Sequence, residues 1–201
     1  NLIFKLHKKS RNLQHMEFRW SAKELPNEIK IKALADSFSI SKPLAAILLQ
    51  RGIETPEQAD LFFNPKIEHL HDPFLMQDME KAISRIEKAI ADKEKIIIYG
   101  DYDVDGTTAV STVFSYFRNF NQNMEYYIPD RYKEGYGISK TGIDYAAEHG
   151  FKLIIALDCG IRSNVLVDYA SSLGIDFIIC DHHLPGEEIP AAAAVLNPKR
   201  N

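Results

Sequence analysis

The chain has 201 residues with 24 Lys or Arg against 28 Asp or Glu, a formal net charge of −4, and 45% hydrophobic residues. No run of about 18 apolar residues is present, which excludes a membrane-spanning helix. The two cysteines are too few for a disulfide scaffold and indicate a reducing, cytoplasmic setting. The acidic balance argues against a broad basic surface for nucleic acid, so any such function must come from a local site.

The first 15 residues differ in charge from the rest. Residues 1–15 hold four basic residues and no acidic one, whereas the chain from Met16 onward has 20 basic against 28 acidic residues. We expect residues 1–15 to be an added leader and Met16 to be the natural start.

Residues 16–92 show a helical pattern. Pro43 and Pro56 each begin a short apolar run, as proline prefers in the first turn of a helix. Asp78 precedes a longer segment, residues 79–90, whose apolar residues recur about every 3.6 positions. The sequence therefore predicts a small N-terminal helical region over residues 16–92.

The pattern changes at Lys95, where short apolar segments begin to alternate with amphipathic ones. The predicted strands are 95–100, 124–129, 152–158, 175–181 and 192–198, and the predicted helices are 106–120, 139–150 and 161–174. Strands alternating with helices in this way form βαβ units and a parallel sheet. The strands are apolar throughout because helices bury both faces. We predict an α/β domain over residues 93–201, with a parallel, Rossmann-like sheet flanked by helices.

Acidic residues and histidines lie at the carboxyl ends of three of these strands. They are Asp101, Asp103 and Asp105 after the first strand, Asp158 at the end of the third, and Asp181, His182 and His183 at the end of the fourth. The carboxyl ends of parallel strands lie along one edge, where such folds bind ligands. Crowded carboxylates repel one another unless they are protonated or bound to cations. Oxygen-rich ligation with one or two imidazoles suits Mn²⁺ or Mg²⁺, and two metals sharing a carboxylate suit in-line attack on a phosphodiester.

Other interpretations of these residues are weaker. Helix capping explains a single acid such as Asp105, but not three clusters on successive strand ends. The segment DYDVDG matches the start of a calcium-binding EF-hand loop, yet Thr112 occupies the position that requires a bidentate Glu. The spacing of Cys159 and Cys180 ahead of the histidines matches no zinc finger, so buried small hydrophobes are the better interpretation.

The segment IPDRYKEGYGIS, residues 128–139, connects the second strand to its helix at the same edge of the sheet. Arg131 and Lys133 are candidate phosphate contacts, and Tyr132 or Tyr136 is a candidate for stacking on a base or sugar. A polar surface turn is the alternative. The position beside the acidic clusters favours a functional role for Arg131.

The motifs YGDYDVDGTTA, IPDRYKEGYG, LDCG and DHH, in this order, resemble the DHH phosphoesterase superfamily. The forms DYDVDG and EGYG favour its single-strand-specific DNA exonucleases over its pyrophosphatases. The motifs cover about residues 96–198, and the helical stretch before them also resembles the N-terminal regions of these exonucleases.

The resemblance implies a function for each residue of the site. Two Mn²⁺ or Mg²⁺ ions would be held by Asp101, Asp103, Asp105, Asp158 and His182. Asp158, which would bridge the ions, and His183, which would face the scissile phosphate, would be the catalytic residues. Arg131, His183 and Tyr136 would contact the substrate. The implied reaction hydrolyses single-stranded DNA in the 5′→3′ direction to 5′-mononucleotides, in DNA repair and recombination.

One departure from the family concerns length. The family has a further metal-ligating Asp beyond DHH and then more domains, whereas this sequence ends at Asn201. We therefore expect an N-terminal piece of a longer protein, with little activity of its own. Two other functions stay open: a phosphodiesterase acting on short oligoribonucleotides or cyclic dinucleotides, and a catalytically silent binding module. The resemblance further implies a single-strand-binding protein or helicase as partner, and we expect a cytoplasmic monomer.

Overall fold

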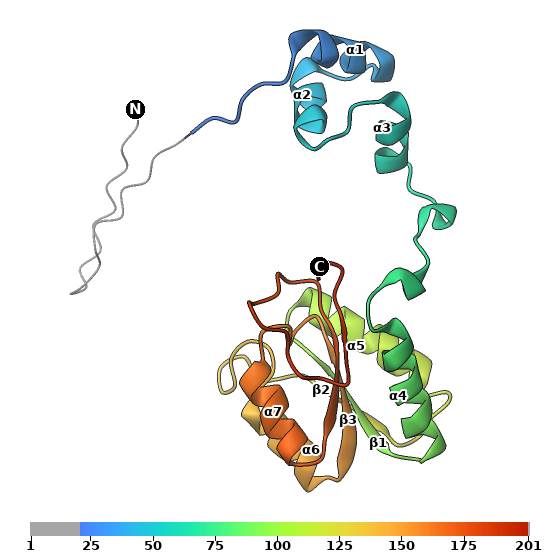
Figure 1. Ribbon diagram of the computed structural model, residues 1–201, viewed down its shortest axis with the longest axis vertical. Coiled ribbons are helices and arrows are strands. Elements are labelled where there is room, and N and C mark those ends of the chain that lie inside the picture. The colour runs from blue at the N-terminus through green and yellow to red at the C-terminus, as the bar shows by residue number, and fades with distance from the viewer. Residues whose placement is uncertain (1–20, 201) are drawn as a thin grey trace, which may run out of the picture. The chain divides into compact units, whose positions relative to one another are not determined.

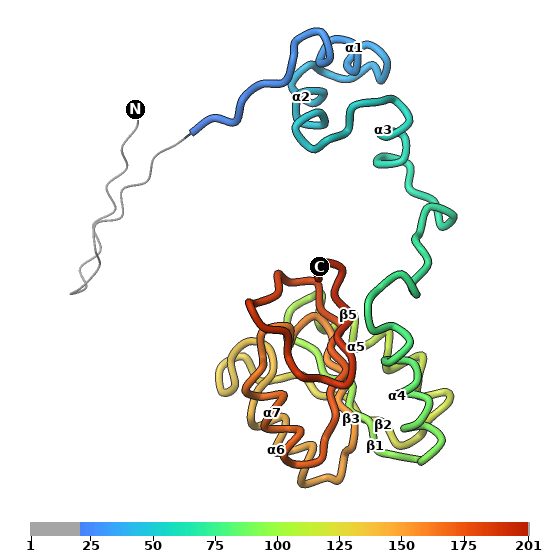
Figure 2. Tube along the Cα trace, viewed as in Figure 1, coloured from blue at the N-terminus to red at the C-terminus, as the bar shows by residue number. Residues whose placement is uncertain are grey.

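The computed structural model describes residues 21–200 (Figures 1 and 2), so the expected leader, residues 1–15, lies outside the described residues. The chain divides into two compact units between Leu70 and His71. In the described residues, no helix combines the length and the apolar character needed to cross a membrane.

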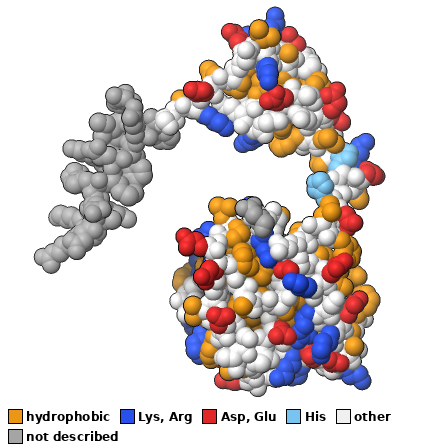
Figure 3. Space-filling view, viewed as in Figure 1, with side chains coloured by type: hydrophobic (Ala, Val, Ile, Leu, Met, Phe, Trp, Pro, Cys, Tyr) orange, Lys and Arg blue, Asp and Glu red, His pale blue; other side chains and the backbone are white. Residues whose placement is uncertain are grey.

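The N-terminal unit is helical, as predicted. Its elements are α1 (Glu28–Phe38), α2 (Lys42–Gln50), α3 (Pro56–Phe63) and the short 3₁₀ turn η1 (Ile67–His69). Proline begins both α2 and α3, and Thr55 and Gln58 form a capping box at the start of α3. Apolar residues of α1 and α2 form a small core that includes Leu34, Ala45 and Leu48. Other apolar side chains of this unit stay at the surface among charged ones (Figure 3).

The second unit contains a five-stranded sheet in which every pair of neighbouring strands is parallel. The strands are β1 (Lys95–Gly100), β2 (Met124–Tyr127), β3 (Phe151–Leu157), β4 (Asp176–Cys180) and β5 (Ala194–Leu196), in the order β2-β1-β3-β4-β5. The predicted parallel α/β fold is confirmed. The central strands are buried almost throughout because helices cover both faces of the sheet.

The helices of this unit form a layer on each face (Figure 1). They are α4 (Met79–Ala91) and α5 (Val104–Phe117) on one face, and α6 (Lys140–Glu148) and α7 (Asn164–Ser172) on the other, with the 3₁₀ turn η2 (Pro73–Leu75) ahead of α4. The sequence predicted a domain boundary between residues 92 and 93. Instead, α4 belongs to the sheet unit, because Ala82 and Ala89 are buried in one apolar cluster with Ile96 and Ile98 of β1.

The crossover connections position the site. The chain passes from β1 through α5 on one face to β2, and from β3 through α7 on the other face to β4. Because the connections after neighbouring β1 and β3 diverge to opposite faces, a crevice opens at their carboxyl ends. Helix α5 begins close against β1: a Cβ on Gly106 would lie 2.6 Å from the backbone nitrogen of Asp101. Glycine at this position therefore keeps the acidic turn after β1 tight.

Candidate metal centre

Asp158 lies at the centre of the site, directly after β3. Its backbone is left-handed, with φ of 60°, a conformation that Asp and Asn tolerate better than most residues. Its side chain is 9% exposed, and its Oδ1 lies 3.0 Å from Nε2 of His182. The left-handed turn directs the carboxylate out of the strand and toward the segment that follows β4.

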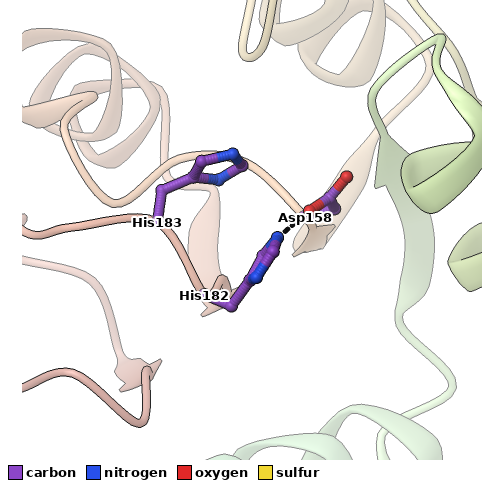
Figure 4. A group of neighbouring side chains, drawn as sticks. All are labelled: Asp158, His182 and His183. Atoms are coloured by element: carbon purple, nitrogen blue, oxygen red, sulfur yellow. Dashed lines mark ion pairs between the residues drawn. The ribbon is translucent and has the colours of Figure 1, made fainter. Parts of the chain in front are cut away.

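Two imidazoles join this carboxylate. Ligand atoms of Asp158, His182 and His183 all lie within 4.8 Å of one another. Figure 4 shows the two rings and the carboxylate gathered from the segments after β4 and β3, with the Asp158–His182 contact dashed. The sequence predicted Asp158 and His182 as ligands and placed His183 against the phosphate. Geometrically, His183 also lies within reach of the same centre.

Asp181 organises the turn that carries both histidines. Its side chain is 1% exposed. Its Oδ1 accepts hydrogen bonds from the backbone nitrogen and Nδ1 of His183, at 3.0 and 2.7 Å, and its Oδ2 accepts one from the Ile161 nitrogen. Burial raises the pKa of Asp181, but these hydrogen bonds outweigh burial and lower it. An ionised Asp181 keeps a proton on Nδ1 of His183, which leaves Nε2 of His183 facing the Tyr136 hydroxyl at 3.4 Å.

The three acids after β1 have different surroundings. Asp101 is fully buried, and its Oδ1 accepts a hydrogen bond of 2.7 Å from the Tyr102 nitrogen. Its buried Oδ2 has no hydrogen-bond partner among the described residues. Asp103, rather than Asp105, is the N-cap of α5, since its Oδ1 accepts a hydrogen bond from the Gly106 nitrogen at 3.0 Å.

Asp105 is exposed and lines a cavity of about 520 Å³ together with Asp158, Asp181 and His182. The remaining wall of this cavity is largely apolar and includes Met79 and residues at the end of β5. The three acids after β1 therefore differ: Asp101 is buried, Asp103 caps α5, and Asp105 is open to solvent.

The electrostatics of the site favour a cation. Burial and the neighbouring Asp103 raise the pKa of Asp158, and the two histidines only partly offset this. Burial and then Asp101, Asp158 and Asp103 raise the pKa of Tyr136 to about 12, so the acids act together on this hydroxyl. A buried carboxylate oxygen without a partner is costly, and a divalent cation would satisfy it. The residues present therefore fit a metal centre.

A row of aromatic rings extends from this centre to Arg131. Cζ of Arg131 lies 5.3 Å from the centroid of the Tyr102 ring. The Tyr102 and Tyr136 rings meet edge-on at 6.1 Å, and the Tyr136 and His183 rings do so at 6.3 Å. Of the two tyrosines that the sequence offered for stacking, Tyr136 therefore faces the site, whereas Tyr132 is 94% exposed.

Asn197 was missed by the sequence analysis. It is 3% exposed and lies just after β5. Its Nδ2 donates a hydrogen bond of 2.9 Å to the carbonyl of His183, and its Oδ1 accepts one of 2.7 Å from the Lys199 nitrogen. An Asn-Pro pair after a strand signals only a turn. Nothing in the sequence shows that its amide bonds to the backbone of His183.

Comparisons with known proteins give the family of this chain and several similar proteins. The DHH family, N-terminal domain, matches residues 95–201. The single-stranded-DNA-specific exonuclease RecJ of Bacillus subtilis (strain 168) is 41% identical over 184 residues, which cover 92% of this chain and 23% of that protein.

Two solved structures are also similar. A crystal structure of exonuclease RecJ bound to manganese is 26% identical, with a TM-score of 0.59 over 64% of this chain and 33% of that one. RecJ from Thermus thermophilus in complex with Mn²⁺ is 23% identical and shares the fold, with a TM-score of 0.61 over 90% of this chain and 25% of that one. The chain thus spans between a quarter and a third of these two structures.

Proposed function

The chain belongs to the DHH family, and from this membership we propose that it forms the metal-binding part of a 5′→3′ exonuclease. The enzyme would hydrolyse single-stranded DNA to 5′-mononucleotides in DNA repair and recombination. The observation that carries the proposal is the grouping of Asp158, His182 and His183 after β3 and β4, at the edge of the sheet where Asp101, after β1, has a buried oxygen with no hydrogen-bond partner among the described residues. Because the chain spans 23% of the length of B. subtilis RecJ, the activity, substrate and partners of a whole protein are all part of the proposal.

Two divalent ions, Mn²⁺ or Mg²⁺, would be held at this edge of the sheet. The proposed ligands are Asp101, Asp103, Asp105, Asp158 and His182. Manganese is supported by the RecJ structure that contains it. When bound, such ions polarise a phosphoryl oxygen and lower the pKa of a bound water to near neutrality. In the chain itself, Asp101 supplies an oxygen that lacks a hydrogen-bond partner among the described residues, and Asp158 supplies a carboxylate whose ionised form a cation would stabilise.

His183 is the second proposed catalytic residue. Asp181 fixes its ring through Nδ1, so that only Nε2 can contact a phosphate. A protonated Nε2 would donate a hydrogen bond to a phosphoryl oxygen and stabilise the charge that develops there. The orientation of the ring is set before substrate arrives, because Asp181 is buried and both of its oxygens accept hydrogen bonds, one from His183 and the other from the Ile161 nitrogen after β3.

Arg131 and Tyr136 complete the proposed substrate contacts. A guanidinium binds phosphate oxygens in a planar, bidentate manner, and a tyrosine ring provides a stacking surface for any base. On the face drawn in Figure 3, Lys and Arg side chains of the sheet unit are mixed with Asp and Glu. With a net charge of −4, the chain would grip DNA through these local contacts rather than through a broad basic surface. The single-strand-binding protein or helicase, the monomeric state and the cytoplasm stay predictions.

The test is a cleavage assay on an oligothymidylate that carries a 5′-phosphate and a 3′ fluorophore. It is run with this chain and with B. subtilis RecJ in which this chain replaces the matched segment. We expect the chimera to release mononucleotides successively from the 5′ end in Mn²⁺ and none in EDTA. Faster cleavage of dinucleotides or cyclic dinucleotides would indicate a phosphodiesterase for short substrates. Binding of single strands without cleavage by the chimera would indicate a silent module.

A matched pair of variants tests the substrate contacts. Arg131→Ala removes the guanidinium beside Tyr102, whereas Lys133→Ala removes a neighbouring exposed charge. A hydrogen bond to a charged group contributes about 1.5–3 kcal/mol. We therefore expect Arg131→Ala to weaken oligonucleotide binding by at least about tenfold. Equal losses in the two variants would show that charge alone, and not a phosphate contact by Arg131, accounts for binding.

A further inference from the structure

The segment between β2 and α6, residues 128–139, is folded around the carboxylate of Glu134. Its Oε2 accepts hydrogen bonds from the Tyr127 hydroxyl at 2.8 Å and the Ser139 hydroxyl at 2.5 Å. Its Oε1 accepts one of 2.7 Å from the backbone nitrogen of Asp130. Glu134 thus joins the end of β2, the first turn of the loop and the start of α6, three places that are separate along the chain.

The other end of the loop is fixed through Ser139 and Tyr99. Ser139 is the N-cap of α6, and its Oγ also accepts a hydrogen bond of 2.9 Å from the Gly142 nitrogen. Its backbone nitrogen donates to the buried Tyr99 hydroxyl at 3.0 Å, and that hydroxyl donates to the Gly137 carbonyl at 3.1 Å. The loop is therefore tied to β1 as well as to β2.

These hydrogen bonds are made by residues just before and just after Tyr136 in the chain. Glu134 lies two residues before it, and the Gly137 carbonyl that accepts from Tyr99 comes directly after it. Gly135 and Gly137, with φ of 86° and 78°, allow the sharp turns on either side. Tyr136 itself is 57% exposed, so apolar packing does little to hold it. Its direction toward His183 depends on the polar contacts of its neighbours.

We propose that Glu134 is a positioning residue, whose carboxylate fixes the loop that presents Tyr136 and Arg131 to the metal centre. Glu134 is not among the residues that surround the centre, so it acts on the substrate side of the site alone. An acceptor is needed at Oε1, because the Asp130 nitrogen can only donate. The part of the inference that concerns substrate contact rests on the proposed function. The part that concerns the rigidity of the loop does not depend on it.

The test compares Glu134→Ala and Glu134→Gln with Glu148→Ala, an exposed glutamate that makes no side-chain hydrogen bond or ion pair among the described residues. Amide hydrogen exchange of residues 128–139 is measured first. We expect Glu134→Ala to speed exchange in this loop at least tenfold while β1 and β3 stay protected. Glu134→Gln should fall between wild type and Ala, because its amide oxygen can still accept from the Asp130 nitrogen.

Binding is then measured on the same variants. Mn²⁺ affinity is followed by calorimetry, and affinity for a 5′-phosphorylated phosphorothioate pentathymidylate is followed by anisotropy in Mn²⁺. We expect Glu134→Ala to lower oligonucleotide affinity at least tenfold, with Mn²⁺ affinity unchanged and partial rescue in Glu134→Gln. Unchanged loop exchange, or a parallel loss of Mn²⁺ affinity, would overturn the inference. If the wild type binds Mn²⁺ but no oligonucleotide, the proposed substrate fails, and the exchange measurement still decides whether Glu134 fixes the loop.

Discussion

Replacing Asp158 with Asn tests two effects of this carboxylate: its charge destabilises the metal-free chain, and its binding of Mn²⁺ stabilises the chain. Asn has the same shape and tolerates the left-handed backbone of this position, so the change removes charge with little strain. Without metal, the pKa of Asp158 is raised by burial and by Asp103. Because folding raises this pKa, the carboxyl costs stability as the pH rises above its unfolded pKa near 4, so at pH 7 it opposes folding. Metal-free Asp158→Asn should therefore melt at the same temperature as wild type or above it.

Bound Mn²⁺ should reverse the order of the two melting temperatures, so that wild type melts above Asp158→Asn. At a concentration of about 100 times its Kd, Mn²⁺ stabilises the chain that binds it by about 2.7 kcal/mol. For a unit of the size of residues 71–201, this corresponds to an increase in melting temperature of roughly 10 °C. A hundredfold loss of affinity in Asp158→Asn leaves about 0.4 kcal/mol at the same concentration, a shift below about 2 °C.

The assay is thermal unfolding of the sheet unit at pH 7, followed by circular dichroism with and without Mn²⁺, beside calorimetric titration. Asp168→Asn is the matched control, since Asp168 is an exposed aspartate on α7 outside the site. Two results would refute the reasoning. A full Mn²⁺ shift in Asp158→Asn would show that this carboxylate is not a ligand. A metal-free variant that melts several degrees below wild type would show that its charge is not a cost.

Two further predictions concern groups that brace the site. Hydrogen bonds from Lys81 and then Arg200 lower the pKa of Asp78 to about 2, so its stabilisation is present above the unfolded pKa near 4 and is lost as the pH falls toward 2. Urea unfolding should show Asp78→Asn less stable by about 2 kcal/mol at pH 7, with a difference that shrinks below about pH 4, and an unchanging difference would contradict the prediction. Asn197→Ala removes the hydrogen bond to the His183 carbonyl and should weaken Mn²⁺ binding by about 10–100-fold in calorimetry, whereas unchanged affinity would limit Asn197 to a structural role.

The strands and most helices could be predicted because their signals are local. The predicted strand 95–100 coincides with β1, and the predicted helix 161–174 contains α7, Asn164–Ser172. A short apolar run between turn residues has few other ways to bury itself. The meeting of Asp158 with His182 also followed from the sequence, because the carboxyl ends of β3 and β4 are neighbours in a parallel sheet.

The finer chemistry of the site could not be predicted, because it depends on which donor each oxygen meets. Asp101 and Asp181 are both acids at strand ends. Among the described residues, Asp101 has an oxygen without a hydrogen-bond partner, whereas both oxygens of Asp181 accept hydrogen bonds, from His183 and from Ile161. Glu134 appears in the sequence only as one charge in a polar loop. Its three donors come from residues that are four to seven positions away, and nothing in their order reveals that they converge.

The packing of α4 against the sheet also could not be predicted from the sequence. A stripe of Ala82, Ile86 and Ala89 predicts a helix with one buried face, but the stripe is identical whether that face covers another helix or a sheet. The partner is decided by distant residues: Arg85 of α4 lies 2.6 Å from Asp176 at the start of β4. At the other end of the unit, Asp78 lies 2.7 Å from Arg200, just after β5. The helix thus joins both ends of the sheet, and its Met79 lines the same cavity as His182. Losing its packing should therefore disturb the metal centre without removing any ligand.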